Sequence, residues 1–222
     1  MIETAKTARV LFDEGHSEAW TIDPERAAAM QPSHPGDSSM AHAAALLRRR
    51  DFEVEPTASG ALAEQLAGAS VLVIAHPSDS KWEATTGEGE PRFSEAELDA
   101  IEAFVDAGGG LVVLGETEQD KYGSNLNDLL DRFGVRVENA TVQDYEHHRG
   151  DAPSWVLPDL LPGSHAGSDP LVRVEEVCFY RAGTLALSNG AEPIAMTSAS
   201  AAGPRRGLRN SRPGAGSDGP GP

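Results

Sequence analysis

Acidic and imidazole side chains follow three apolar stretches of the chain, at the points where strands are predicted to end. The stretches are residues 9–12, 71–75 and 111–114, and the polar residues that follow them are Asp13, Glu14, His16, His76, Asp79 and Glu116. The carboxyl ends of neighbouring parallel strands meet at one edge of a sheet, where α/β proteins bind ligands. We therefore predict that Glu14, His16, His76 and Glu116 face one crevice.

Carboxylates beside imidazoles could serve three kinds of chemistry at such a crevice. They could hold a metal ion, transfer protons, or hydrogen-bond the hydroxyl groups of a polyol. Their spacing matches no metal-binding motif, so no metal and no other cofactor is predicted. The alternative, in which these side chains form a polar rim that caps loops and helices, stays open.

Three further side chains are candidate ligand contacts near this crevice. Trp82 could stack on a sugar ring, as Trp20 could, or Trp82 could pack beneath a lid formed by residues 80–92. Asn125 and Asn127 could bind a ligand at the rim, or act as a helix cap and an inner polar contact. The predicted ligand-binding residues are Glu14, His16, His76, Trp82, Glu116, Asn125 and Asn127.

No activated nucleophile is evident after the predicted strands. In α/β enzymes a nucleophile often occupies the turn after a strand, and the turn after residues 111–114 carries Glu116 and no Ser or Cys. The single cysteine, Cys178, lies in a β-rich stretch and is predicted to be buried and structural. His147 and His148 are adjacent, so a strand would direct them to opposite faces, and we predict that they are exposed. No catalytic residue is assigned.

The chain is strongly acidic and carries a net charge of −17. Residues 201–222 contain four Arg and one Asp, which sum to +3, so residues 1–200 carry −20. Nucleic acids and anionic membranes are polyanions that bind through Lys and Arg, and neither is predicted as a partner. No signal peptide and no apolar run of roughly 20 residues is seen, and one cysteine forms no internal disulfide. We predict a cytoplasmic protein without membrane insertion.

Strand and helix patterns alternate along the chain, which predicts a mostly parallel sheet flanked by helices. Strands are predicted at residues 9–12, 52–55, 71–75, 111–114 and 135–137, and helices at 61–66, 94–107 and 125–133, with a further helix from a cap at Asp37 or Ser38 to about Arg50. The continuous apolar run at 111–114 indicates a strand covered on both faces by helices. Ser94 and Glu97 form a capping box. A long loop is predicted from the first strand to about Gly36.

The C-terminal part of the chain has a different pattern. Three β-rich stretches, at 172–180, 184–187 and 193–197, predict an antiparallel extension of the sheet. Ten of residues 201–222 are Gly or Pro, a composition that cannot build a core. We predict a domain at residues 1–200 and a disordered tail at 201–222, whose abrupt onset suggests a truncated or frame-shifted end.

One run of residues resembles a known family. The sequence GGGLVVLGE at residues 108–116, then Asn125-Leu126-Asn127, Leu129-Leu130 and Phe133-Gly134-Val135, resembles the GIFT domain of intraflagellar transport proteins and of gliding-motility proteins associated with ABC transporters. That domain is part of the class I glutamine amidotransferase-like superfamily, and the resemblance covers residues 9–197. It implies a flavodoxin-like, doubly wound, mostly parallel α/β sheet with no established catalysis, and a saccharide ligand has been suggested for the family.

The residues and the resemblance together predict a non-catalytic, amidotransferase-like binding domain. Its ligand is either a saccharide or a protein partner. The alternative prediction is a hydrolase that uses Glu116 with His16 or His76 in the crevice.

Overall fold

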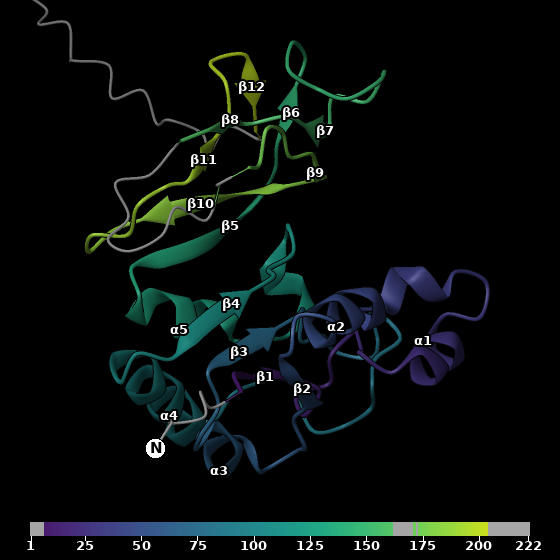
Figure 1. Cartoon of the computed structure of the whole chain (residues 1–222). Coiled ribbons are helices and arrows are strands. Elements are labelled where there is room, and N and C mark those ends of the chain that lie inside the picture. Colours follow the sequence, from purple (N-terminus) through teal and green to yellow (C-terminus); the bar gives the residue numbers. More distant parts are fainter. Residues whose placement is uncertain (1–6, 162–170, 172, 204–222) are drawn as a thin grey trace, which may run out of the picture.

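Four parallel strands form the central sheet of the protein. The computed structural model describes residues 7–161, 171 and 173–203, and the sheet has the order β2-β1-β3-β4 (Figure 1). The strands are β1 (Arg9–Phe12), β2 (Glu53–Pro56), β3 (Val71–Ile74) and β4 (Gly110–Val113). Their side chains alternate between two separate cores, with Leu11 and Leu72 on one face of the sheet and Val10 and Val73 on the other. The predicted α/β class is therefore confirmed.

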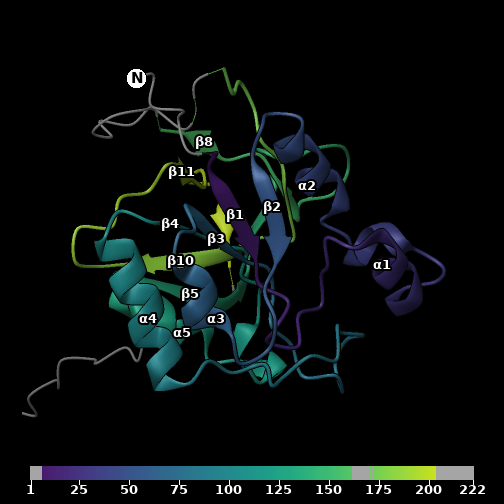
Figure 2. The ribbon, with the colours of Figure 1, turned by 60° about the horizontal axis from the view of Figure 1, so that its bottom comes forward.

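Three helices cover the first face of the sheet. They are α3 (Leu62–Leu66), α4 (Glu95–Asp106) and α5 (Leu126–Arg132), and Figure 2 shows them on one side of the strands with α2 (Ala41–Arg48) on the other. The capping box predicted for α4 is confirmed, since Ser94 Oγ accepts from the Glu97 N–H at 3.4 Å and Glu97 Oε2 accepts from the Ser94 N–H at 2.8 Å. Leu98 and Ile101 then bury the inner side of α4 in the core.

The second face is covered over only part of its width. α2 packs on the core formed by β1, β2 and β3, but Val112 and Leu114 on the β4 side remain 44% and 39% exposed. The expectation that residues 111–114 are covered on both faces is therefore wrong. β4 is an edge strand of the sheet. An apolar run indicates a strand, but it does not show which helices or strands cover that strand.

The long loop predicted between the first strand and Gly36 contains a helix, α1 (Pro24–Met30). Asp23 caps it by accepting from the N–H groups of Glu25 and Arg26, and Pro24 occupies its first turn. An acidic cap followed by proline is a recognised helix start, so the signal was present in the sequence. A 3-10 helix, η1 (Pro35–Ser38), follows, and α2 begins at Ala41 instead of after a cap at Asp37 or Ser38.

The C-terminal strands form small antiparallel pairs above the parallel sheet, in the orientation of Figure 1. The pairs are β5 (Val135–Thr141) with β10 (Gly183–Leu187), β6 (Gln143–Asp144) with β12 (Ala201–Ala202), β7 (Trp155–Val156) with β9 (Phe179–Tyr180), and β8 (Asp159–Leu160) with β11 (Ala195–Met196). The predicted antiparallel extension is confirmed. β12 lies beyond the domain boundary predicted at residue 200, and residues 204–222 of the predicted tail lie outside the described residues.

Asp144 joins β6 to the end of the described chain. Its fully buried carboxylate accepts hydrogen bonds from the hydroxyls of Ser198 and Ser200 and from the N–H groups of Glu146 and His147. Burial alone would raise the pKa of Asp144, but these hydrogen bonds outweigh burial and hold the pKa well below its usual range. This cluster therefore anchors the strand that the sequence assigned to a tail.

Cys178 and the two adjacent histidines lie in the same C-terminal part. Cys178 is exposed, so its predicted burial is wrong. It immediately precedes the two-residue strand β9, and both residues of β9 are exposed. His147 is exposed as predicted, whereas His148 is half-buried.

The side-chain amide of Asn127 acts as a strand partner for β5. Its Nδ2 donates to the Val137 carbonyl at 3.0 Å and its Oδ1 accepts from the Val137 N–H at 2.9 Å. Asn127→Ala should therefore lower the free energy of unfolding by about 2 kcal/mol, because two backbone groups of a buried residue lose their partner. Urea denaturation followed by circular dichroism measures this loss. Asn139→Ala is the control, because it removes an amide of the same strand whose hydrogen bonds, both to Asp120, are exposed to solvent. An equal loss in both variants would contradict the assignment.

Candidate functional site

A buried hydrogen-bond network follows β1 at the carboxyl end of the sheet. His16 Nδ1 lies 2.8 Å from Asp13 Oδ2, and His16 Nε2 lies 3.2 Å from Glu97 Oε1 at the start of α4. The ring of His16 packs on Phe93 with 4.0 Å between ring centroids. Both ring nitrogens of His16 are therefore engaged within the protein, where they join the turn after β1 to α4.

The carboxylate of Glu14 is also used inside the protein. Its Oε1 accepts from the Thr21 hydroxyl at 2.8 Å and from the Ile22 N–H at 2.7 Å. Its Oε2 lies 3.5 Å from Arg26 Nη1 on α1. Glu14 thus fastens the segment that leads into α1.

Asn125 repeats the arrangement seen for Asn127. Its Oδ1 accepts from the Phe93 N–H at 2.8 Å and its Nδ2 donates to the Phe93 carbonyl at 2.9 Å. Asn125 precedes α5, but its side chain makes no capping hydrogen bond to that helix. The predicted helix-cap role is therefore wrong, because the amide is committed to a segment 32 residues away in sequence.

Residues 80–92, predicted as a lid or surface loop, pack directly on the turn after β1. The Ser17 N–H donates to the Glu88 carbonyl at 2.6 Å, and the Thr86 N–H donates to the Glu18 carbonyl at 2.8 Å. Gly89 has a φ of +68°, and a Cβ atom there would lie 2.2 Å from the Gly15 carbonyl oxygen. A glycine is therefore required at this crossing, and the segment covers the crevice on the side of Glu14 and His16.

His76, Trp82 and Glu116 lie in a different part of the crevice, around Tyr122 of the 3-10 helix η2 (Gln119–Tyr122). The His76 ring meets the Tyr122 ring edge-on with 4.4 Å between centroids. The Asp79 N–H donates to the Tyr122 carbonyl, and the Trp82 N–H donates to the Asp79 carbonyl. Burial raises the pKa of Tyr122, and the charges of Glu83 and Glu116 raise it further. We call the residues His76, Trp82, Glu83, Glu116 and Tyr122 the His76 corner.

The imidazole of His76 is the unusual group of this corner. His76 is 3% exposed and its Nε2 lies 3.2 Å from Glu83 Oε2, but neither ring nitrogen has hydrogen-bond geometry to any described residue. Its φ of +77° is strained for a residue with a side chain, as are the positive φ values of Ser17 and Glu118 in the turns after β1 and β4. Strained non-glycine residues cluster at functional sites. The structure thus separates the seven predicted ligand contacts into an internal network and this corner.

Glu18, Glu83 and Glu97 are residues of these sites that the sequence did not single out. Glu18 is fully buried, and no described residue donates a hydrogen bond to its ionised carboxylate, whereas the protonated carboxyl can donate to Asp13. Burial raises the pKa of Glu18 well above its usual value, and the nearby Asp13 and Glu14 raise it further. In the sequence Glu97 is recognisable only as part of a capping box, and no pattern points to Glu83. Their neighbours at these sites are set by the packing of loops, which the sequence does not show.

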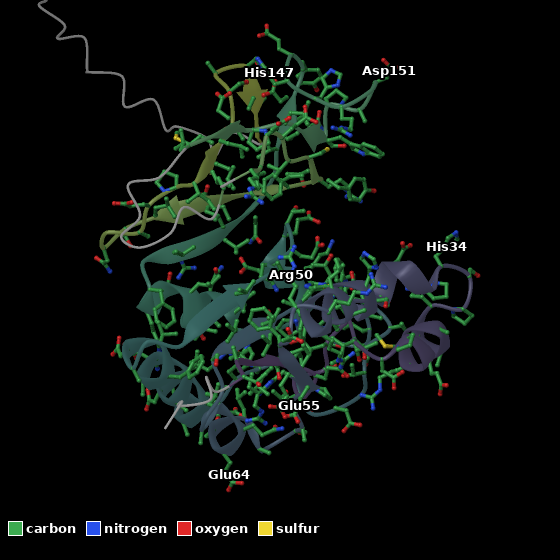
Figure 3. All side chains as sticks on the ribbon, viewed as in Figure 1. His34, Arg50, Glu55, Glu64, His147 and Asp151 are labelled. Carbon is green, nitrogen blue, oxygen red and sulfur yellow. The ribbon has the colours of Figure 1, made fainter. Side chains whose placement is uncertain are left out.

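The described residues outside these sites include a hollow among the C-terminal strands. No group of three or more His, Cys, Asp and Glu side chains is arranged among the described residues to hold a metal ion, and no described helix is long and apolar enough to cross a membrane. The hollow has a volume of about 480 Å³ and is lined by Glu146, His147, His148, Leu157, Pro158, Asp159, Leu160, Glu175 and Glu176. His147 in Figure 3 marks this end of the molecule, on the opposite side from Glu64 of α3.

Comparisons with known proteins agree with the fold. The sequence model of a family described as "ABC-type uncharacterized transport system" matches residues 14–205. Intraflagellar transport protein 52 homolog of Mus musculus is 26% identical over 95 residues, which are 42% of this chain and 20% of that protein. The Homo sapiens homolog is 24% identical over 110 residues, 49% of this chain and 22% of that protein. The chain therefore spans about a fifth of the length of these curated relatives.

A solved structure supports the same relationship. The structure named mmIFT52 N-terminal domain superposes with a TM-score of 0.61 and 18% sequence identity, and it covers 87% of this chain and 75% of that chain. This similarity shows a shared fold. Together with the family match and the two curated relatives, it confirms the resemblance to the GIFT domain.

Proposed function

Because this chain belongs to the family described as "ABC-type uncharacterized transport system", we propose that it is a non-catalytic domain that binds a protein partner. The family match and the fold make it a transport-associated domain related to the N-terminal domain of intraflagellar transport protein 52. That it binds a protein partner is what we propose beyond this relationship.

Exposed aromatic side chains on the C-terminal strands are the observation that carries this proposal. Trp155 and Tyr180 are paired residues of β7 and β9, are 42% and 68% exposed, and contact each other edge-on at 5.8 Å between ring centroids. Phe179 and Tyr145 are exposed in the same part of the chain. Tyr and Trp are enriched at the centres of protein interfaces, where they contribute most of the binding energy. We call Trp155 and Tyr180 the aromatic surface.

The state of the crevice also favours a protein partner over the saccharide and hydrolase alternatives. Both alternatives use polar groups at the strand ends, and of these Glu14 and His16 are already bonded within the protein, which leaves His76, Trp82 and Glu116 of the crevice residues for a ligand. Asn125 and Asn127 are bonded to backbone groups. A sugar or a scissile bond would have to compete with these internal hydrogen bonds, which are costly to leave unmade.

A comparison of two variants tests the proposal. The full chain, a Trp155→Ala/Tyr180→Ala variant and a Leu46→Ala control are used to capture proteins from cells of the source organism, followed by calorimetry with the purified partner. We expect the double variant to weaken binding by about 30-fold or more, since interface hot spots are worth about 2 kcal/mol or more. Leu46 is an exposed apolar residue on α2, and its replacement should change affinity by less than about twofold. Equal affinity of the double variant and the full chain would contradict the proposal.

A further inference from the structure

The charged acceptors of the His76 corner are the carboxylates of Glu83 and Glu116. A carboxylate accepts hydrogen bonds only, and Glu83 Oε2 lies 3.2 Å from His76 Nε2. Among the described residues neither ring nitrogen of the buried His76 has hydrogen-bond geometry to a partner, although a buried polar group is normally satisfied. A ligand that binds these two carboxylates must bring donors.

The charges of the corner are not balanced by the lysines around it. Lys81 pairs with Asp79 at 2.8 Å and Lys121 pairs with Glu118 at 2.8 Å. Among the described residues the only ion pair of Glu83 is with His76, and Glu116 has none. Glu83 is partly exposed and Glu116 is half-buried, so both carboxylates can be reached from solvent.

The aromatic rings of the corner already face cations. Lys81 Nζ lies 5.9 Å from the centre of the exposed Trp82 ring, and Lys121 Nζ lies 4.9 Å from the centre of the Tyr122 ring. A cation within about 6 Å of an aromatic face is attracted by the negative face of the ring. The net charge of −20 on residues 1–200 adds a long-range attraction for cations.

We propose that the His76 corner binds a protonated amine or guanidinium group. Such groups carry donors and no acceptors, which complements the carboxylates of Glu83 and Glu116, while the buried imidazole of His76 lies 3.2 Å from the Glu83 carboxylate. Trp82 immediately precedes Glu83, and its exposed ring is the reporter of binding at the corner. The corner is separate from the aromatic surface, so this site and the proposed protein-binding function can fail independently.

Binding of N-acetyl-arginine amide to the full chain tests the proposal. The indole N–H signal of Trp82 is followed by NMR during the titration, and it is assigned by its loss in Trp82→Phe. A saturable shift is expected with N-acetyl-arginine amide and none with N-acetyl-citrulline amide, which has the same shape without the charge. A shift of equal size with citrulline or with glucose, or no saturable shift at all, overturns the proposal.

Matched variants separate a specific site from general attraction to an acidic protein. Glu83→Gln should weaken binding about tenfold or more, since hydrogen bonds to charged groups are among the stronger ones. Glu90→Gln removes the same charge from an exposed position of the same segment and should change affinity by less than about twofold. Equal weakening by both variants overturns the proposal. Tighter binding of spermidine than of an arginine-containing tripeptide identifies a free polyamine as the ligand, and the reverse order identifies a side chain of a polypeptide.

Discussion

Asp13→Ala is expected to lower the free energy of unfolding by about 3–5 kcal/mol, the usual cost of removing one partner from a buried ion pair. The carboxylate of Asp13 accepts from the Thr57 hydroxyl at 2.6 Å and the Gly15 N–H at 3.2 Å, and it lies 2.8 Å from His16 Nδ1. Its removal leaves His16 and Thr57 with unpaired polar groups in the interior. Urea denaturation measures the loss. The control is Asp151→Ala at an exposed position, which should change stability by less than about 0.5 kcal/mol.

The decrease in the free energy of unfolding caused by Asp13→Ala is expected to depend on pH through His16. Burial lowers the pKa of His16, but Asp13 and Glu97 together outweigh burial and raise the pKa above its ordinary value of 6.5. A histidine whose folded-state pKa is raised adds stability that is complete below the unfolded-state pKa and is lost as pH rises through the folded-state pKa. The difference between the wild type and Asp13→Ala should therefore be larger at about pH 6 than at about pH 9. A difference that grows with pH would mean that His16 is not the group held by Asp13.

Glu18→Gln is expected to stabilise the protein at high pH. Glu18 is buried beside Asp13 and Glu14, and its pKa is raised from 4.5 in the folded state, first by burial and then by these two neighbours. Between the unfolded-state and folded-state pKa values the folded protein binds the extra proton, so the free energy of unfolding falls as pH rises through this window. Glutamine cannot ionise, and it removes this fall. A gain of about 1–3 kcal/mol at about pH 9 is the scale of an unsatisfied buried polar group.

The measurement for Glu18 compares urea denaturation of both proteins at about pH 5, just above the ordinary glutamate pKa of 4.5, and at about pH 9. The gain should be small at the lower pH and larger at the higher pH. Glu90→Gln, which removes an exposed carboxylate, should leave the pH dependence unchanged. A destabilised Glu18→Gln variant at both pH values would show that the ionised carboxylate has a partner in solution.

Local patterns in the sequence determined the elements of this fold. The strand at Arg9–Phe12 has the predicted bounds, and the capping box at Ser94 marks the residue before α4. Signals of this kind act over a few residues, since a strand period, a cap or a helix stop involves only neighbours along the chain. The α/β class followed from them, whereas the relationship to the GIFT domain rested on the resemblance of residues 108–135 to that family. The cap at Asp23 is another local signal of this kind, since it marks the residue before α1.

Only the tertiary structure decided which polar groups meet. His16 is bonded to Glu97 across 81 residues, and Asn125 is bonded to the backbone of Phe93 across 32 residues. The neighbouring sequence does not distinguish a carboxylate or amide that hydrogen-bonds a buried group from one that binds a ligand, because both roles use the same side-chain chemistry. The partner is chosen when packing brings distant segments together and every buried polar group must find a hydrogen bond. For the same reason the predicted crevice residues separated into an internal network and a corner around His76, whose imidazole has no hydrogen bond to the part of the chain that the structure describes.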